Sequence, residues 1–339
     1  MLKNKKVLRA ALIGVGGHGA THLRALQKLE NVEVCGLCDM RQEAIDEALK
    51  TTAGNPTVST RPTEFVESID CDYAVIAVPN PARIPLIEVL LRRKIPLLIE
   101  KPAAHTLEDL SRLLQWQREA EVPVMVAHNY RFMPGALAVR NFLRQGTIGP
   151  VTDVHGFFKR NHAIAGQFYY GRLEGPLPFR IEMVIHHLDL VRGWIGGNAR
   201  SIIADGGRTA VSWGVGETSC DVLAEFDNGV RLNYHGDWAA PANLTDFSGH
   251  WTLTGEKGCI QWRDNTVEVR LLHPDRVTWS EGERWIVTPA AGAEDSTLAE
   301  HREWATSLRE GRVSECHLTD AAESLRLCLI AAGKHSHTG

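Results

Sequence analysis

The sequence lacks several features that would each point to a class of protein. Its 339 residues include 37 Lys or Arg and 41 Asp or Glu, and the net charge of −4 gives no basic field for binding nucleic acid. No apolar run reaches the roughly 20 residues that a membrane-spanning helix needs. Internal repeats and low-complexity tracts are also missing. The composition is that of a soluble globular protein, long enough for two domains with a core each.

The cysteines lack the pairing that a metal or redox site would need. There are seven, an odd number, and only Cys35 and Cys38 have C-x-x-C spacing. Both fall in a predicted strand, where residues three apart point to opposite faces. Plain buried thiols therefore explain them better than metal or redox chemistry.

A convincing secretion signal is missing as well. A lysine-rich segment, Lys3 to Lys6, precedes an apolar run, Val7 to Ile13, but Arg9 interrupts that run and a glycine motif follows it directly. A buried first strand is the better interpretation, so we expect a cytoplasmic protein.

That glycine motif, A-L-I-G-V-G-G-H-G-A at residues 11–20, is the strongest signal present. Gly14, Gly16 and Gly19 form G-x-G-x-x-G between the predicted strand and a segment with helical apolar spacing. The glycines permit a tight turn, close approach of a pyrophosphate, and close packing of helix on strand. The helix N-terminus then attracts the phosphates.

A carboxylate stands where a dinucleotide site requires one. A second strand, Val32 to Cys38, ends at Asp39, which lies 20 residues after Gly19 and could bind the adenosine ribose. Asp39 should repel a 2′-phosphate, whereas Arg41 could attract one. We therefore expect NAD rather than NADP.

Short apolar strands then alternate with helices up to residue 128. Strands are predicted at 57–60, 73–78, 96–99 and 124–127, with helices at 41–50, 63–68, 81–94 and from the cap Thr106 to about residue 121. This alternation predicts right-handed crossovers and a doubly wound parallel sheet, an α/β Rossmann domain over residues 1–128.

From residue 129 the pattern changes to serial strands. The predicted elements are a helix at 134–145, a strand at 151–159, a loop to residue 180, a helix at 181–194, strands at 201–204, 219–226, 230–238, 249–254, 258–262 and 267–272, and helices at 297–310 and 319–334. A hairpin signal, Asp227-Asn228-Gly229, joins two of the strands. These features predict an α+β domain over residues 129–339 with a large, open, mostly antiparallel sheet.

Five motifs together resemble the glucose–fructose oxidoreductase / inositol dehydrogenase / MocA (Gfo/Idh/MocA) family, over nearly the whole chain. They are the glycine motif at 14–19, Pro79-Asn80, Glu100-Lys101-Pro102, Asn129-Tyr130-Arg131 and His186-His187-Leu188-Asp189. The resemblance implies an NAD(P)-binding oxidoreductase acting on one carbon of a sugar, inositol or related polyol. It also implies a cis bond between Lys101 and Pro102, and assembly of a homodimer or homotetramer through the open sheet.

Two residues depart from the family's pattern. Glu182 stands four residues before His186, where the family usually has Asp, and its extra methylene changes the reach of the carboxylate. Arg83 stands after Pro79-Asn80, where the family often has His. Neither departure removes Lys101 or His186.

The helix at 181–194 carries the second half of the predicted chemistry. Glu182, His186 and Asp189 share one helix face, whereas His187 points elsewhere. A histidine suits removal of a hydroxyl proton, and a lysine can stabilise the alkoxide. Lys101, His186 and Glu182 are thus the predicted catalytic residues. Asp189 could serve only to orient a histidine or to cap backbone, and Glu182 could pair with Lys101 or Arg180.

The remaining predicted contacts follow from strand ends and from the resemblance. Ligands of a doubly wound sheet lie beyond the carboxyl ends of its strands. Predicted cofactor contacts are Gly14, Val15, Gly16, Gly17, His18, Gly19, Asp39, Met40, Arg41, Val78, Pro79, Asn80, Glu100, Lys101, Pro102 and Asn129. Predicted substrate contacts are Lys101, Arg131, Lys159, Arg160, His186, Asp189 and Trp238. Solvated basic side chains and a core Trp explain several of these equally well.

Two other functions remain open, and a metal site is not expected. A glycoside hydrolase that oxidises its substrate transiently with bound NAD would use the same residues. A non-catalytic NAD-binding sensor has no evident use for Lys101 or His186. A metal site at His186 and His187 is disfavoured because adjacent helical residues diverge.

Overall fold

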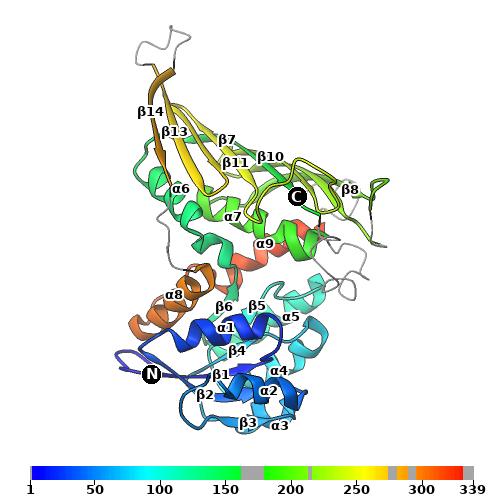
Figure 1. Cartoon of the computed structure of the whole chain (residues 1–339), viewed down its shortest axis with the longest axis vertical. Coiled ribbons are helices and arrows are strands. Elements are labelled where there is room, and N and C mark those ends of the chain that lie inside the picture. The colour runs from blue at the N-terminus through cyan, green and yellow to red at the C-terminus, as the bar shows by residue number, and fades with distance from the viewer. Residues whose placement is uncertain (1, 162–178, 213–215, 274–280, 289–294, 331–339) are drawn as a thin grey trace. The chain divides into compact units, whose positions relative to one another are not determined.

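The chain forms two compact units. The computed structural model describes residues 2–161, 179–212, 216–273, 281–288 and 295–330 (Figure 1). Met1–Phe132 groups with Glu294–Ala322, and Met133–Ala293 groups with Glu323–Gly339. The predicted single boundary after residue 128 left the segment 294–322 in the second domain. The structure groups this segment with the first unit because its helix α8 (Ser296–Glu310) packs against elements of that unit.

The first unit contains the predicted doubly wound parallel sheet. Its six strands run in the order β3-β2-β1-β4-β5-β6, and every pair is parallel. The strands are β1 (Leu8–Ile13), β2 (Val32–Cys38), β3 (Thr57–Ser59), β4 (Tyr73–Ile76), β5 (Leu97–Glu100) and β6 (Val124–Ala127). The helices are α1 (His18–Gln27), α2 (Gln42–Leu49), α3 (Pro62–Ser68), α4 (Asn80–Arg92), α5 (Leu107–Ala120) and the 3₁₀ helix η1 (Asn129–Phe132). The strand order reverses between β1 and β4, and folds of this kind bind ligands outside the carboxyl ends of the strands at such a reversal.

The core of this unit is built by the strands and by α8. All residues of β4 and β5 are buried, as expected for strands covered on both faces. Trp304 of α8 is fully buried and meets Tyr73 edge-on, with 6.2 Å between ring centroids. The Arg309 side chain also donates to the Lys5 carbonyl, at 3.0 Å. The last third of the sequence therefore completes the first domain's core.

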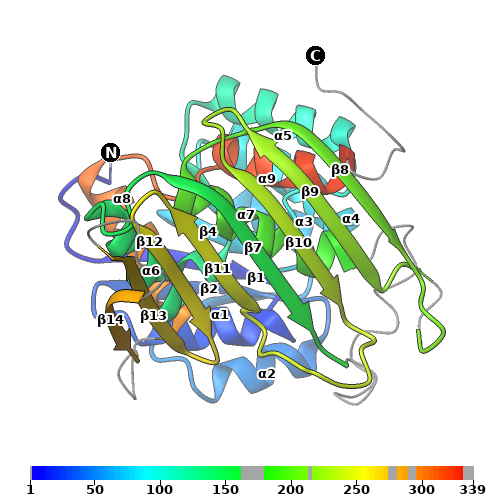
Figure 2. The same ribbon diagram turned by 90° about the horizontal axis from the view of Figure 1, so that it is seen from above.

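The second unit is built on an eight-stranded sheet, and Figure 2 shows its strands side by side. Their order is β14-β13-β12-β11-β7-β10-β9-β8. They are β7 (Val151–Lys159), β8 (Ala199–Gly207), β9 (Ser219–Phe226), β10 (Arg231–Asp237), β11 (His250–Gly255), β12 (Gly258–Arg263), β13 (Thr266–Leu272) and β14 (Glu281–Val287). All pairs are antiparallel except β7 with β10, which is parallel. The mostly antiparallel prediction is confirmed, although β14 was not predicted.

The helices of the second unit include one local irregularity. They are α6 (Pro134–Arg144), the π-helix η3 (Arg180–Val184), α7 (Ile185–Ile195) and the later part of α9 (Leu318–Ile330). The predicted helix 181–194 is thus split into a π-helical start and an α-helical remainder, and single π turns are frequent at functional sites. Residues 162–178 of the predicted loop and 331–334 of the predicted last helix lie outside the described residues.

Two expectations concern the pair of cysteines in β2 and the length of the apolar helices. Cys35 and Cys38 are buried and unbridged, and burial raises the pKa of their thiols to about 11 and about 12, so plain buried thiols are confirmed. None of the helices in the described part of the chain has the length and apolar character needed to cross a bilayer.

Candidate functional site

The glycine loop after β1, Gly14 to Gly19, leaves no room for a Cβ at two of its glycines. Gly14 has a φ of +86°, and a Cβ there would lie 2.9 Å from the Ala77 carbonyl carbon. A Cβ on Gly19 would lie 1.9 Å from the Gly14 oxygen. Real Cβ atoms do not approach this closely, so both positions require glycine. The first lets the chain turn and the third brings α1 against β1, as the motif predicts.

The N-terminus of α1 is open to an anion. Its N-cap, Gly17, has a φ of 52° and no side chain, and in the described part of the chain no acidic residue occupies the first turn. The helix dipole and the first backbone N–H groups therefore face the loop without a competing carboxylate on the helix. These features fit the pyrophosphate of a dinucleotide.

Asp39 holds the loop from the end of β2. Its Oδ2 accepts hydrogen bonds from the backbone N–H of Val15 at 3.0 Å and of Gly16 at 3.2 Å. Its Oδ1 accepts from the Arg41 backbone N–H at 3.0 Å, with the Arg41 Nε at 3.5 Å. A Cβ on Gly16 would lie 2.1 Å from the Arg41 Nη2. The Arg41 guanidinium therefore lies against the glycine that must admit the pyrophosphate.

The turn that carries Lys101 is anchored by two side chains of α4. Asn80 donates from Nδ2 to the Pro102 carbonyl at 2.9 Å. Arg83 donates to the Val78 carbonyl at 3.1 and 2.8 Å, to the Pro102 carbonyl at 2.7 Å, and to the Glu100 carbonyl. The Lys101–Pro102 bond between these carbonyls is cis, as the resemblance implies. Arg83, which the sequence shows only as a departure from the family, is thus a buried clamp on this turn.

Beside Lys101, the buried Glu100 side chain contacts one buried and one exposed histidine of α1. Its Oε1 is 2.7 Å from the His22 Nε2 and 3.2 Å from the His18 Nε2. The other ring nitrogen of His22, Nδ1, is 2.8 Å from the His301 Nε2. Burial raises the pKa of Glu100, but the hydrogen bond from His22 and the charges of His22, His18 and Lys101 outweigh it and hold the pKa well below its usual range. Burial keeps the pKa of His301 low, so that ring is neutral.

The strand ends of the first unit therefore bring one set of predicted residues together. Four groups of predicted cofactor contacts lie at the carboxyl ends of β1, β2, β4 and β5, next to the point where the strand order reverses. They are Gly14 to Gly19, Asp39 to Arg41, Val78 to Asn80, and Glu100 to Pro102. Their contact with a cofactor stays a prediction.

Two further residues of this unit have internal partners. Asn129 opens η1 and donates from Nδ2 to the Ser296 Oγ at 3.4 Å. Arg131 is only 9 % exposed, and its Nη2 lies 2.7 Å from the Asp320 Oδ2. This ion pair ties η1 to the start of α9, so Arg131 is not the solvated side chain of the alternative interpretation, and its substrate contact stays a prediction.

In the second unit, α7 carries the two adjacent histidines, His186 and His187. His187 is fully buried, where its Nε2–H donates to the Phe247 carbonyl at 3.1 Å and its Nδ1 accepts from the Tyr234 hydroxyl at 2.7 Å. Burial lowers its pKa to about 4, so the ring is neutral at pH 7. His187 thus faces the sheet, and His186 immediately precedes it on α7.

The predicted partners of His186 have different surroundings. Asp189 is 1 % exposed and accepts a hydrogen bond from the Ser324 hydroxyl of α9 at 2.8 Å, and Arg192 donates to the same hydroxyl at 2.9 Å. Asp189 thus belongs to a buried hydrogen-bonded group that links α7 to α9, and its predicted roles toward a histidine or a substrate stay predictions. Glu182 lies half-buried in η3, and Arg180 pairs with Glu217 at 2.8 Å.

The other predicted substrate contacts of the second unit pack internally. Trp238 is 2 % exposed, and its ring lies 5.1 Å from that of Phe179. The Lys159 Nζ lies 5.3 Å from the Phe157 ring. Because Phe157 alternates with buried Phe158, which contacts His187 of α7, Lys159 lies on the strand face opposite α7.

Arg160 follows β7 and is engaged nearby. Its guanidinium lies 4.3 Å from the Phe247 ring centroid, and its Nη1 donates to the Thr245 carbonyl at 3.0 Å. These contacts fit a side chain that stabilises the loop after β10.

Comparison with known proteins decides the family. Residues 8–128 match the family model described as an oxidoreductase family with an NAD-binding Rossmann fold. Residues 136–261 match the GFO/IDH/MocA C-terminal domain. The chain belongs to the Gfo/Idh/MocA oxidoreductase family. This Gfo/Idh/MocA protein therefore has an NAD-binding Rossmann domain, and its glycine loop is the expected place for the dinucleotide.

Full-length relatives of this Gfo/Idh/MocA protein are distant. A D-apiose dehydrogenase from Paraburkholderia graminis is 26% identical over 336 residues, covering 95% of this chain and 86% of that protein. An uncharacterized protein, y4oX, from Sinorhizobium fredii is 26% identical over 93% of this chain and 92% of its own length. The crystal structure of an oxidoreductase from Agrobacterium radiobacter, in complex with NAD+, L-tartaric acid and magnesium, superimposes with a TM-score of 0.86, 21% identity and 96% coverage of both chains. At that identity the likeness shows the fold alone.

Proposed function

We propose that this Gfo/Idh/MocA protein is an NAD-dependent dehydrogenase or reductase that acts on a CH–OH carbon of a sugar, an inositol or a related polyol. The observation that carries the proposal is the clamped turn at Lys101, which follows the same sheet edge as the open glycine loop. A D-apiose dehydrogenase among the relatives, named for a sugar, supports this substrate class.

The first unit binds the cofactor in this proposal. The glycine loop and the N-terminus of α1 receive the pyrophosphate, and Asp39 accepts from a ribose hydroxyl after exchanging its bonds to the loop. Its negative charge disfavours a 2′-phosphate. Bound nicotinamide supplies the chemistry of hydride exchange.

The protein's own groups manage the proton. Lys101 stabilises the alkoxide that develops on the reacting hydroxyl. His186 accepts the hydroxyl proton in oxidation and returns it in reduction, and Glu182 orients its ring. Trp238, Lys159, Arg160 and Arg131 carry less weight as substrate contacts because each has an internal structural partner.

A substrate screen with a matched pair of lysine variants tests this function. Purified protein is incubated with NAD+ or NADP+ and panels of inositols, hexoses, pentoses and their acids, and reduced cofactor is followed by absorbance. Lys101→Met should lower turnover by about 100-fold or more while leaving NADH affinity nearly unchanged. The control is Lys50→Met, because Lys50 is exposed at the end of α2, where it pairs with nearby Glu47. Near wild-type turnover in Lys101→Met would contradict the assignment.

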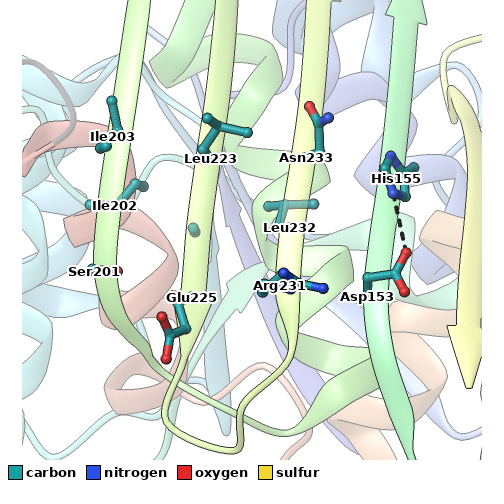
Figure 3. Close-up of a pocket in the computed structure, with 11 residues that line it drawn as sticks. Asp153, His155, Ser201, Ile202, Ile203, Leu223, Glu225, Arg231, Leu232 and Asn233 are labelled. Carbon is teal, nitrogen blue, oxygen red and sulfur yellow. Dashed lines mark ion pairs between the residues drawn. The ribbon is translucent and has the colours of Figure 1, made fainter.

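We further propose that the open face of the large sheet joins two copies of the chain. Figure 3 shows this face, where Ile203 and Leu223 lie on neighbouring strands and are 58% and 51% exposed. The two residues are direct partners in the β8–β9 ladder. They line a shallow hollow of about 690 Å³ whose other side chains include Glu225 and Arg231. Exposed aliphatic side chains beside charges of both signs suit a self-complementary contact.

A further inference from the structure

Three metal-ligating side chains converge at the start of α1, outside the proposed hydride and proton chemistry. His18 and His22 are four residues apart on the helix and therefore share one face. Glu100 reaches the same point from the end of β5. The ligating atoms of the three side chains all lie within 4.8 Å of one another.

The donor set matches the chemistry of zinc. Two imidazoles and one carboxylate bind Zn²⁺ in many proteins, with about 2.0–2.2 Å from metal to donor and hence about 3.3 Å between donors of a tetrahedral site. The His18 Nε2 is 3.2 Å from the Glu100 Oε1, which meets this spacing. The His22 Nε2 is 2.7 Å from the same oxygen, so the His22–Glu100 pair must open by about 0.6 Å to reach this spacing.

The same three side chains can be held together by hydrogen bonds or by a metal ion. The Glu100 Oε1 can accept hydrogen bonds from both rings, because a carboxylate oxygen has two lone pairs. A metal ion would take the place of these protons, and the three ligating atoms lie close enough together to share one ion.

The buried His22 ring already has a hydrogen-bond partner that fixes its orientation. Ligating histidines usually donate their second ring N–H to a neighbour that fixes the ring. The His22 Nδ1 is 2.8 Å from the Nε2 of His301, which is fully buried on α8. With metal on Nε2, His22 carries its proton on Nδ1 and donates it to His301. The proton that left the His22 Nε2 is matched by one gained on the His301 Nδ1, so the two tautomers change together and no proton is released.

The burial pattern provides an entry path. His22 and Glu100 have side chains only 1% and 9% exposed, whereas the His18 side chain is 49% exposed. An ion would reach the buried pair from the side of His18 and keep its fourth position toward solvent. We propose that His18, His22 and Glu100 form a binding site for Zn²⁺ or a similar divalent transition metal, with three protein ligands and one open position.

The test uses the metal alone and does not depend on the proposed enzyme activity. Untagged protein is freed of metal and dinucleotide with a chelator, and Zn²⁺ is titrated in by calorimetry, with Co²⁺ as a spectroscopic probe. We expect one strong site per chain and the visible bands of four-coordinate Co²⁺. Loss of an outer partner of a ligand typically costs 10–100-fold in affinity, so His18→Ala, which removes a ligand itself, should weaken binding by about 100-fold or more.

The control histidine is chosen from the surface. His155 is exposed and lies 3.1 Å from Asp153, a pair that offers two ligating groups rather than three. His155→Ala should bind Zn²⁺ as the wild type does. Because His18 is half exposed, its replacement should not unfold the protein, and circular dichroism checks this. Binding only at millimolar Zn²⁺, or equal affinity in wild type and His18→Ala, would overturn the proposal.

Discussion

Replacing Arg83 by methionine removes the buried guanidinium that clamps the Lys101 turn but keeps most of the side-chain volume. The guanidinium donates to the carbonyls of Val78, Glu100 and Pro102. A hydrogen bond from a charged donor contributes about 1.5–3 kcal/mol and a neutral one about 1 kcal/mol. A buried carbonyl that loses its hydrogen-bond partner destabilises a protein less than a buried N–H that does. We therefore assign a stability loss of about 1–1.5 kcal/mol to each of the three carbonyls. The expected destabilisation of the first unit is therefore about 3–5 kcal/mol.

The stability lost in Arg83→Met is best measured by hydrogen–deuterium exchange of the peptides that contain β4 and β5. Their exchange gives the opening free energy of the first unit alone. Arg92→Met is the matched control: Arg92 lies on the same helix, its side chain is 69% exposed, and its Nη1 is 3.6 Å from Glu88. Its replacement should change the opening free energy by about 0.5 kcal/mol or less. Equal effects of the two variants would refute the clamp.

Further predictions concern the cofactor, the two histidines and assembly. Arg41→Ala should weaken NADPH binding more than NADH binding; tighter NADPH binding by the wild type would overturn the argument from Asp39. His186→Ala should lower turnover by about 100-fold or more, and His187→Ala should lower it less, since His187 is held by the sheet. The folded pKa of His187 is about 4 against an ordinary 6.5, so the unfolded chain binds the proton first and stability should fall as pH drops from 6.5 towards 4. In urea denaturation, His187→Gln should flatten this dependence; an unchanged slope would contradict it. Leu223→Arg should convert a dimer or tetramer to monomers in light scattering, and a monomeric wild type would exclude the proposed contact.

Much of the fold was predictable because local patterns and tertiary packing agree. The apolar runs that became β1, β4 and β5 are buried throughout or nearly so. Gly14, with its positive φ, follows β1, and the charged Glu100 ends β5. The glycines of the loop were predictable for the same reason, since the structure leaves no room for a Cβ on Gly14 or Gly19.

What could not be predicted depends on contacts between residues far apart in sequence. The clamp by Arg83 needs the direction of a side chain whose acceptors lie 17 and 19 residues away. The π-helical start at residues 180–184 depends on backbone hydrogen bonding that apolar spacing does not encode. His22 and His301 are separated by 279 residues, and no spacing rule relates them.

The return of α8 to the first unit has a consequence for how this protein is made. The strands of the Rossmann domain leave the ribosome early, but Trp304, which closes against Tyr73, is synthesised after nearly all of the other domain. At about 5–20 residues per second, the interval between residues 132 and 310 is roughly 10–40 s. During that time the nascent domain exposes the apolar surface that α8 later covers. The first domain of the sequence is thus completed only late in translation.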